Sequence, residues 1–435
     1  MYPAKLEKKI SPNQLDFFIN QTPNNNVSLS KNFNEIKNYF NRLNQDLSHF
    51  TNSNDICTPM DCVKEMVDKI PQEFWERKNI KILDCCCGNG NFHGYISTKT
   101  NLNNLYFNEI NPSRIANLKN YFGKNINLTT QDFLQFTNQP IYDLIVANPP
   151  YAKFNDDIRT SKNHNLSRDF IKKALDLTKE NGYILFIVPN NWMSFSDRNI
   201  LPKELTKYQF IHLDIHGAKK WFPKVGSSFT WFLLQKTPNH KSFSVSNSYK
   251  INDHQIVKLN PNQNFIPLYL SPIICDILQK TINNKKLARY KIETTSDLHR
   301  TTKKQFISDD QSDEYRYKLI HTPTKSVWSK KPHKFQDGWK VFISLTNQYS
   351  TFIDNCAMTQ SIAFVRCESK EHAIKIKSEL DHDVFKFLNN ITRYGNFNNI
   401  RILQQFPILD SFSLSDEEKK FINLFNSKYY GKKEK

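Results

Sequence analysis

The sequence predicts an α/β protein in which a mostly parallel sheet, covered by helices on both faces, precedes a mixed α+β region. From residue 55 to about residue 236, short apolar runs alternate with amphipathic segments, as in chains that form a parallel sheet. Beyond residue 240 this alternation ends, and strand-like and helix-like pieces mix with clusters of turn residues. The change predicts a domain boundary near Thr237-Pro238-Asn239.

Seven strands and three intervening helices are expected in the first of these regions. Continuous apolar runs, rather than alternating ones, indicate strands that are buried on both faces. The last strand is expected to be antiparallel, because only a loop separates it from the strand before it. The predicted strands cover residues 80–84, 105–109, 125–129, 142–147, 183–188, 210–214 and 229–235, and the predicted helices cover residues 60–69, 112–121 and 167–180.

Two further segments flank this region. Residues 1–54 are rich in Asn and carry apolar residues at helical spacing, which predicts a helical N-terminal segment. The predicted domains are therefore 1–54, 55–237 and 238–435. Near the C-terminus, Ser415 and Glu418 have the spacing of a capping box and predict the start of a last helix, which ends near Ser427.

The composition excludes several classes of protein. With 38% apolar and 13% aromatic residues and no heptad or triplet repeat, the chain is neither fibrous nor disordered throughout. No apolar run approaches the ~20 residues of a membrane span, and the N-terminus lacks a signal peptide's apolar segment, so a cytoplasmic protein without a membrane partner is expected. The eight Cys lack the spacing of zinc ligands or of a disulfide framework, so free thiols and no metal are expected.

The charge of the chain points to a polyanionic partner. The chain has 60 Lys and Arg against 42 Asp and Glu, for a formal net charge of +18. Residues 241–435 hold 31 of the positive and 20 of the negative residues, a net +11. Lys and Arg that neutralise phosphates release counterions, which favours binding to nucleic acid. A solubilising surface explains the same charge, so charge alone does not decide.

Glycine is rare, with 10 residues in the chain, yet three glycines lie together directly after the first predicted strand. They are Gly88, Gly90 and Gly94, and the strand before them ends at Asp84. A strand that ends in Asp and continues through a Gly-x-Gly turn into a helix lets a ligand approach the backbone at the sheet edge. A plain turn is the alternative, which is less favoured in a chain with so little glycine.

Residues that suit an adenosine pocket follow the next two strands. Glu109, at the end of the second strand and followed by Ile110, is positioned to accept hydrogen bonds from a ribose diol. After the third strand, Asp132 offers an acceptor for an exocyclic amino group, and Phe133 offers a face for an adenine ring. In the Gly-x-Gly-x-x-Gly motif of dinucleotide-binding proteins the third Gly would fall at position 93, which is His here. The pattern therefore favours a ligand with a single nucleoside.

The fourth strand runs directly into Asn148-Pro149-Pro150-Tyr151. The two prolines remove backbone donors, which leaves carbonyl oxygens as acceptors. Asn148 adds a side-chain acceptor, and Tyr151 adds a flat aromatic face. These groups suit an amino group on a planar base, because accepting both of its N–H bonds aligns the nitrogen lone pair with an electrophile. A rigid loop after a strand is the alternative explanation.

In these residues the chain resembles the N6-adenine DNA methyltransferases that use S-adenosylmethionine. The resemblance is to the γ-type enzymes of restriction-modification systems, whose cofactor motifs precede the recognition domain. It is close over residues 55–236 and looser over residues 241–435, and Cys85 stands where the family often has Pro. The other matching segments are Cys57-Thr58-Pro59, Val188-Pro189-Asn190-Asn191-Trp192, the segment from Trp221-Phe222-Pro223 to Ser228, Arg393-Tyr394-Gly395-Asn396 and Gln405-Phe406-Pro407.

The resemblance implies a Rossmann-like methyltransferase fold with a C-terminal target-recognition domain. It implies S-adenosylmethionine as the cofactor and site-specific transfer of a methyl group to N6 of an adenine flipped out of double-stranded DNA. Asn148 and Pro149 are implied to hold the amino group, between the rings of Tyr151 and Phe222. The implied cofactor site consists of Thr58, Pro59, Asp84, Gly88, Gly90, Glu109, Ile110, Asp132, Phe133 and Asn148.

Recognition of the target sequence is expected between residues 240 and 410. The predicted DNA-contacting residues are Lys303, Lys304, Lys330, Lys331 and Arg393. Two alternatives stay open, namely RNA adenine as the substrate and a DNA-binding subunit without catalytic activity. The N4-cytosine enzymes more often begin the four-residue motif with Ser, and the protein-glutamine enzymes are usually smaller. The recognition sequence, the existence of a cognate restriction endonuclease and the oligomeric state stay open too.

Overall fold

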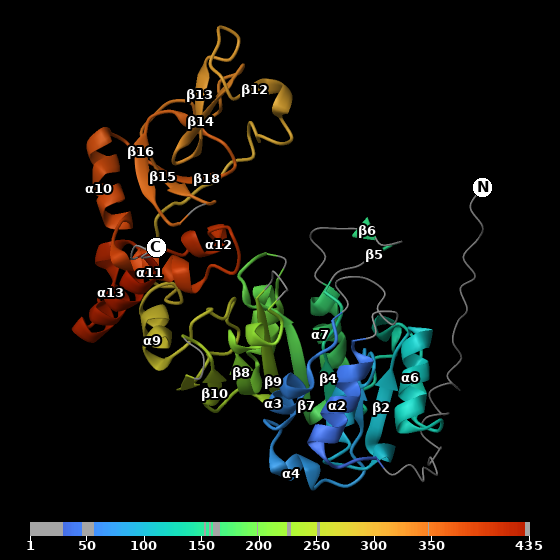
Figure 1. Cartoon of the computed structure of the whole chain (residues 1–435). Helices are drawn as coiled ribbons and strands as arrows, with labels where there is room; N and C mark the ends of the chain where they lie inside the picture. Colours follow the sequence, from blue (N-terminus) through green and yellow to red (C-terminus); the bar gives the residue numbers. More distant parts are fainter. Residues whose placement is uncertain are drawn as a thin grey trace, which may run out of the picture. The chain divides into compact units, whose positions relative to one another are not determined.

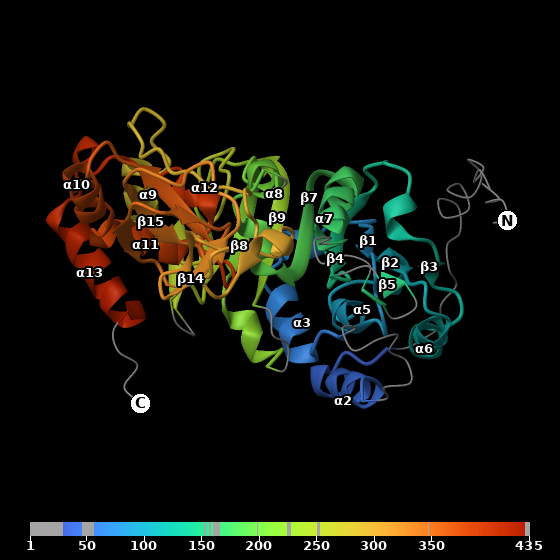
Figure 2. The same cartoon turned by 90° about the horizontal axis from the view of Figure 1, so that it is seen from above.

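The structure is a computed structural model that describes residues 29–45, 56–151, 154–155, 158–159, 166–197, 199–223, 228–249, 253–346 and 348–430. The chain divides into two compact units. Unit 1 comprises Met1–Pro189 and Tyr208–His240, and unit 2 comprises Asn190–Lys207 and Lys241–Lys435. Figure 1 and Figure 2 show the elements of each unit from two directions.

The sheet of unit 1 holds seven strands within the described residues. They are β1 (Ile82–Asp84), β2 (Leu105–Asn108), β3 (Asn127–Thr129), β4 (Tyr142–Ala147), β7 (Thr178–Pro189), β8 (Tyr208–Asp214) and β9 (Phe229–Pro238). Their spatial order is β8-β9-β7-β4-β1-β2-β3. β1, β2, β3, β4 and β7 run parallel, and β9 is antiparallel to both of its neighbours, as predicted for the last strand. The predicted mostly parallel sheet is therefore confirmed.

Helices cover both faces of this sheet. The first face carries α2 (Phe33–Leu43), α3 (Met60–Val67), α5 (Asn91–Ile96) and α6 (Pro112–Phe122), and the other carries α7 (Leu166–Leu177) (Figure 2). One buried apolar cluster joins the helices of the first face to the sheet, with Phe40 from α2 and Val146 from β4 among its members. Shorter elements of unit 1 are α4 (Gln72–Trp75), η2 (Leu102–Asn104), η3 (Phe133–Gln135), η5 (Gly217–Lys220) and the antiparallel pair β5 (Phe154–Asn155) and β6 (Ile158–Arg159).

Several element boundaries differ from the prediction by a few residues, and the start of β7 differs most. The helix predicted for residues 167–180 ends at Leu177, and β7 begins at Thr178. Asn181 has a φ of 62°, a conformation that a right-handed helix cannot contain. Of the predicted N-terminal helical segment, residues 29–45 are described and contain α2, while the rest of residues 1–54 lies outside the described part of the chain.

Unit 2 is a mixed α+β unit with its own apolar core. It has an antiparallel pair, a four-stranded sheet in the order β12-β14-β13-β17 and a three-stranded sheet in the order β16-β15-β18. The strands are β10 (Phe243–Ser246), β11 (His254–Val257), β12 (Ile307–Ser308), β13 (Tyr317–Thr322), β14 (Lys325–Ser329), β15 (Lys340–Ser344), β16 (Thr351–Asp354), β17 (Ala357–Met358) and β18 (Ile362–Arg366). The helices are η4 (Asn190–Met193), α8 (Leu201–Leu205), α9 (Pro272–Lys280), η6 (Lys304–Phe306), α10 (Lys370–Leu380), α11 (Asp383–Ile391), α12 (Ile400–Leu403), η7 (Leu409–Ser411) and α13 (Asp416–Tyr430).

The start of α13 confirms the predicted capping box. The backbone N–H of Glu418 donates to Ser415 Oγ at 3.2 Å, and the backbone N–H of Ser415 donates to Glu418 Oε2 at 2.6 Å. These two bonds satisfy donors that the first turn of a helix otherwise leaves without partners. Lys280 adds a salt bridge to the same carboxylate at 2.8 Å and so ties α9 to α13.

Within the described ranges, no helix is long and apolar enough to cross a membrane. The same residues contain no group of three or more His, Cys, Asp or Glu side chains arranged to hold a metal ion. All eight Cys are described, and all are free thiols.

Candidate active site

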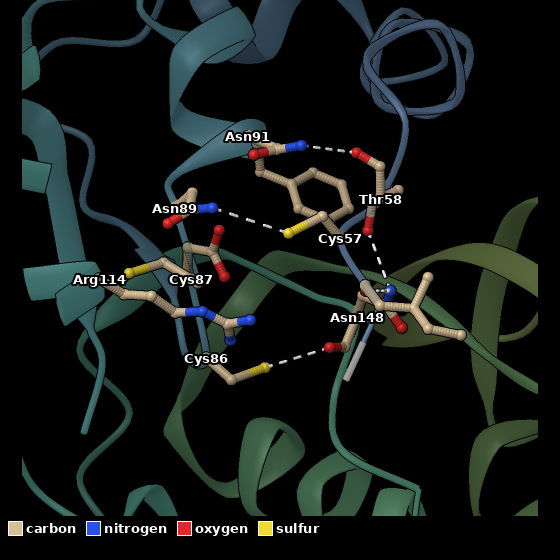
Figure 3. Close-up of a pocket in the computed structure, with 12 residues that line it drawn as sticks. Cys57, Thr58, Cys86, Cys87, Asn89, Asn91, Arg114 and Asn148 are labelled. Carbon is tan, nitrogen blue, oxygen red and sulfur yellow. Dashed lines mark hydrogen bonds between the residues drawn. The ribbon is translucent and has the colours of Figure 1, made fainter. Parts of the chain in front are cut away.

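The carboxyl ends of β1 and β4 border a hollow in unit 1. These two strands are parallel neighbours, so their carboxyl ends lie at the same edge of the sheet. The segment before α3 closes the hollow from the other side (Figure 3). Four of the predicted site residues, from three separate segments of the chain, meet here. The lining residues are Ile56, Cys57, Thr58, Asp84, Cys86, Cys87, Gly88, Asn89, Asn91, Phe92, Arg114 and Asn148.

The three clustered glycines have two different structural roles. Gly88 has a φ of +56°, and a Cβ there would meet only Arg114 Nη1, at 3.7 Å, so its lack of a side chain leaves space in the hollow. Gly90 has a φ of +91°, and a Cβ there would lie 2.6 Å from the ring of Phe122 in α6. At Gly94, a Cβ would overlap the ring of Phe40 in α2. Gly90 and Gly94 therefore allow helices to pack closely, and of the three only Gly88 lines the hollow.

Asp84 is a buried carboxylate at the edge of the hollow, with 1% of its surface exposed. Among the described residues, no group makes a hydrogen bond of normal geometry with either of its carboxylate oxygens. Burial raises the pKa of Asp84 well above its ordinary value; the Cys86 amide opposes this rise, and the charge of Glu109 adds to it. A buried carboxylate with both oxygens available is suited to a cationic ligand group such as an ammonium.

Glu109 follows β2 and is held by the backbone. Its carboxylate accepts from the N–H groups of Gly88 at 2.8 Å, Ile110 at 2.9 Å and Asn111 at 2.8 Å. A carboxylate has about four acceptor positions, so these bonds leave about one for a ligand hydroxyl. Ile110 is 67% exposed, which is unusual for a large apolar side chain and leaves its surface available to a ligand. Binding of a ribose by Glu109 stays a prediction.

Asp132 and Phe133 do not line the hollow. Asp132 is exposed, and its side chain caps η3 by accepting from the Leu134 N–H at 3.0 Å. Phe133 is 2% exposed and packs against the rings of Phe136 and Phe170, with centroids 5.4 Å and 5.2 Å away. In this conformation Phe133 offers no face to an adenine, so its predicted contact stays a prediction that requires the side chain to become exposed.

Asn148 has a fully engaged side-chain amide. Its Nδ2 donates to the Ile56 carbonyl at 3.1 Å and to Thr58 Oγ1 at 3.1 Å. Its Oδ1 accepts from the hydroxyl of Tyr151. Because a carbonyl accepts but cannot donate, the contact with Ile56 determines which end of the carboxamide is nitrogen. Pro149 is buried, and no donor within the described ranges bonds its carbonyl oxygen, which remains available as an acceptor.

Tyr151 and Phe222, the predicted stacking residues, belong to a row of aromatic rings. Phe229 in β9 lies between them, with ring centroids 5.3 Å from Tyr151 and 5.2 Å from Phe222. Tyr151 is half-buried, whereas Phe222 is only 3% exposed. The segment after Phe222, residues 224–227, lies outside the described residues. Stacking of a base between these two rings stays a prediction, and it requires Phe222 to become more accessible than it is here.

Two of the three consecutive cysteines, Cys86 and Cys87, line the hollow, and the pKa of all three thiols is raised. Burial raises the pKa of Cys85 and of Cys87, and a hydrogen bond with Cys85 is the main cause of the raised pKa of Cys86. The thiolate, rather than the thiol, is the nucleophilic form, and a raised pKa reduces its population. A covalent mechanism through these thiols is therefore not supported.

Four of the five predicted DNA-contacting residues lie close together in unit 2. The backbone N–H of Lys330 donates to the Phe306 carbonyl at 3.0 Å, which joins the end of β14 to η6, the helix that follows Lys303. Lys330 forms an ion pair with Glu314 and lies 4.9 Å from the ring of Tyr315, and Lys331 lies 4.4 Å from the ring of Phe306.

The other two lysines of this group are less engaged. Lys303 and Lys304 are exposed, and no ion pair holds either of them within the described part of unit 2. Arg393 lies apart from the four lysines, after α11, where its Nη2 donates to the Asn396 carbonyl at 2.9 Å. Contact of these five residues with DNA stays a prediction.

Sequence reasoning missed several residues that the fold brings to the hollow. Asn89 and Asn91 alternate with Gly88 and Gly90 in the sequence but received no predicted role. Arg114 stands in the first turn of α6 and is only 7% exposed. The sequence could have indicated Arg114, because it lies five residues after Glu109, at the start of a predicted helix that follows the end of a predicted strand.

The strand order is that of a Rossmann-like α/β fold, with the site at the carboxyl ends of β1 and β4. Residues 7–222, just under half of the chain, match the Eco57I restriction-modification methylase family. The predicted resemblance to restriction-modification methylases is therefore confirmed. The Type II methyltransferase M.AccI from Acinetobacter calcoaceticus is 27% identical over 129 residues, which cover 26% of this chain and 24% of that protein. The match thus spans about a quarter of that relative's length.

Solved structures share the fold of the chain. A nuclease-deletion mutant of the Type ISP restriction-modification enzyme LlaGI, in complex with a DNA substrate mimic, has a TM-score of 0.56 and 11% identity, covering 89% of this chain and 56% of that one. The ATP-dependent Type ISP enzyme LlaBIII bound to DNA has a TM-score of 0.51 and 12% identity, covering 91% of this chain and 40% of that one. At these identities the similarity concerns the fold alone.

The methylase family implies S-adenosylmethionine as the cofactor. The residues at the hollow fit such a group. The buried carboxylate of Asp84 is suited to the ammonium group at the methionine end of S-adenosylmethionine. The open space at Gly88 lets a ligand approach the backbone. Thr58 and Asn148 line the same hollow.

Proposed function

We propose that this protein is a site-specific DNA methyltransferase that transfers a methyl group from S-adenosylmethionine to N6 of adenine in double-stranded DNA. The observation that carries the proposal is the orientation of Asn148, whose amide nitrogen is held by Ile56 and Thr58. Asn148 lines the hollow, and its Oδ1 and the carbonyl oxygen of the adjacent Pro149 are the two acceptors that we assign to the base. Oδ1 accepts from the Tyr151 hydroxyl in this structure, so this assignment requires Tyr151 to release it when the base binds. The methylase family that matches residues 7–222 supports methyl transfer, and the basic second unit supports a nucleic-acid substrate.

The two acceptors account for the chemistry at an amino group. When bound, S-adenosylmethionine supplies an electrophilic methyl group on a sulfonium. The lone pair of an adenine amino nitrogen is delocalised into the ring and is weakly nucleophilic. Asn148 Oδ1 and the Pro149 carbonyl accept its two N–H bonds and so favour a nitrogen with a localised lone pair. No strong base is needed beforehand, because the proton becomes acidic once the nitrogen carries a positive charge.

The target base must leave the duplex to reach these acceptors, because its amino group is paired and stacked inside. Stacking on Tyr151 compensates for part of the stacking that the base loses. We assign Phe222 to the opposite face of the base. Its burial against Phe229 means that this assignment requires the segment around Phe222 to rearrange when DNA binds.

The remaining parts of the chain have roles in the same proposal. Residues 55–237 would form the catalytic domain, and residues 238–435 the domain that recognises the target sequence. Lys303, Lys304, Lys330, Lys331 and Arg393 would contact phosphates or bases there. A cytoplasmic location follows from access to DNA. A cognate restriction endonuclease is a further partner, and DNA modified by this protein would then resist its cleavage.

Sequencing of DNA from an expressing host tests the substrate, the modified atom and the site together. The protein is produced in a host without its own adenine methylation, and the Asn148→Ala variant is produced in parallel as the inactive control. We expect N6-methyladenine at one short sequence motif with the wild-type protein and none with the variant. Modified cytosine at N4, or unmodified DNA with methylated RNA, would contradict the proposal.

A further inference from the structure

The side chain of Asn148 is held by a segment that lies far away in the sequence. Nδ2 has two acceptors, the Ile56 carbonyl and Thr58 Oγ1, each at 3.1 Å. Figure 3 shows Thr58 and Asn148 next to one another on the same side of the hollow, joined by a dashed line. The terminal dihedral angle of an Asn side chain is soft, so its orientation depends on such partners.

Thr58 is itself held in place by the turn after β1. Its backbone carbonyl accepts from Asn91 Nδ2 at 2.7 Å, and Asn91 directly follows Gly90. Both Thr58 and Asn91 are buried, at 4% and 5% exposure. Two hydrogen bonds therefore link Asn91, which directly follows the turn, to the backbone of Thr58 and the side chain of Thr58 to Asn148.

The hydroxyl of Thr58 has a second capacity. An O–H group that accepts a bond from Asn148 retains its own proton and can donate it to another acceptor. Because Thr58 lines the hollow, a bound ligand is within the range of such a donor. Ser keeps both capacities in this position, whereas Val has nearly the same shape as Thr and lacks both.

We propose that Thr58 is a positioning residue for Asn148: its hydroxyl holds the amide nitrogen, so that Oδ1 is directed at the amino group of the substrate. This role depends on the proposed function. The alternative is that Thr58 only contacts the cofactor, which is the role that the resemblance implies for it. The two roles predict different kinetics, since lost cofactor contact is compensated by more cofactor, whereas a misdirected Oδ1 is not.

The test compares Thr58→Val and Thr58→Ser with the wild-type protein. Single-turnover methylation of duplex DNA is measured over a range of S-adenosylmethionine concentrations, and cofactor affinity is measured separately by calorimetry. We expect Thr58→Val to lower the rate at saturating cofactor by about tenfold to a hundredfold, the range expected when a catalytic group is misplaced. Thr58→Ser should retain at least half of the wild-type rate.

Thr178→Val is a matched control in unit 1. Thr178 is fully buried, and its hydroxyl is hydrogen-bonded too, here as a donor to the Ala174 carbonyl at 2.7 Å, but it lies at the start of β7 and outside the hollow. We expect this variant to lose thermal stability to a similar extent as Thr58→Val and to keep the wild-type rate. A second test uses Asn148→Ser as the background, where Thr58→Val should change the residual rate less than twofold, because no carboxamide remains to be positioned.

The inference is overturned by any of three results. Thr58→Val keeps the wild-type rate at saturating cofactor, or Thr58→Ser is as slow as Thr58→Val, or Thr178→Val is slowed equally. A wild-type protein that methylates no adenine would instead refute the proposed function itself, so the two failures are distinguishable.

Discussion

The hollow of unit 1 and the lysine group of unit 2 hold their polar side chains in different ways. The side chains of Asn148, which lines the hollow, and of Glu109, which is bonded to Gly88 at the hollow, each have three hydrogen bonds and are buried or nearly so. In unit 2, Lys303 and Lys304 are exposed, and Lys330 pairs with Glu314 at the surface. Buried polar groups need fixed partners, whereas surface ion pairs contribute little to stability. We therefore expect large effects of single substitutions at the hollow and small, salt-dependent effects at the lysines.

The largest effect is expected for Asn148→Ala, which removes the side-chain acceptor of the proposed reaction. Methyl transfer to duplex DNA should fall about 10³-fold, as for the loss of a preorganised catalytic hydrogen bond, while cofactor affinity measured by calorimetry stays within a few-fold. Tyr151→Ala should abolish transfer in the same way. Asn127→Ala is the matched control, because Asn127 also donates two side-chain bonds of 3.1 Å, in its case both to backbone carbonyls, but lies away from the hollow. Normal turnover of the Asn148 variant would refute the site.

The two positive-φ glycines of the turn after β1, Gly88 and Gly90, should separate stability from binding. Gly90→Ala forces a strained backbone and a contact of 2.6 Å with Phe122, so we expect the free energy of unfolding to fall by about 3 kcal/mol. Gly88→Ala has open space around its Cβ, so it should cost about 1 kcal/mol and mainly weaken cofactor binding. Chemical denaturation and calorimetry measure the two quantities. Equal losses of stability in both variants would contradict the assigned roles.

His93 should make the stability of unit 1 depend on pH. It is fully buried beside Phe107, its Nε2 lies 2.8 Å from the Tyr106 carbonyl, and burial lowers its pKa from 6.5 to about 4. As pH falls below 6.5, the unfolded chain binds a proton that folded His93 does not. Stability is therefore lost progressively between pH 6.5 and pH 4, by about 2 kcal/mol at pH 5.

His93→Gln provides the comparison, because Gln keeps a donor but does not titrate in this range. The loss of unfolding free energy between pH 7.5 and pH 5 should be smaller in the variant by about 2 kcal/mol, as measured by denaturant titration. The raised pKa of Asp84 has the opposite sign, since its folded form takes up a proton first as the pH falls. Asp84 is present in both proteins, so its contribution cancels. Identical pH dependence in both would contradict the burial of a neutral His93.

The smallest effects are expected at the lysines. The double variant Lys303→Gln and Lys304→Gln should weaken DNA binding about tenfold at moderate salt and reduce the slope of log affinity against log salt by about 2. Lys330→Gln should reduce the slope by less than about 1, because Glu314 already neutralises this side chain. Binding titrations at several salt concentrations measure both slopes. An unchanged slope in the double variant would exclude these lysines from the DNA interface.

Much of unit 1 was predictable from local sequence, and much of its site geometry was not. Parallel strands buried on both faces have continuous apolar runs, so the strands could be located before their order was known. Asp84, Gly88 and Asn148 were predicted because each ends or follows such a strand at a recognisable turn, whereas Thr58 was implied by the resemblance to the methyltransferases alone. Phe133 and Phe222 were predicted as faces for a base, yet both are buried against neighbouring rings. The burial of a side chain depends on residues that lie far away in the sequence, so a local sequence pattern cannot predict it.

The sequence alone was enough to predict an α/β sheet, the edge at which a site would form and the chemical class of that site. These properties depend on apolar periodicity and on turn residues that are close neighbours along the chain. Tertiary structure alone decided that Thr58 and Ile56 orient Asn148, that Gly90 and Gly94 serve helix packing, and that Lys330 differs from Lys303. The physical reason is that hydrogen bonds, overlaps and ion pairs act over a few ångströms in space, between residues that the chain itself keeps far apart.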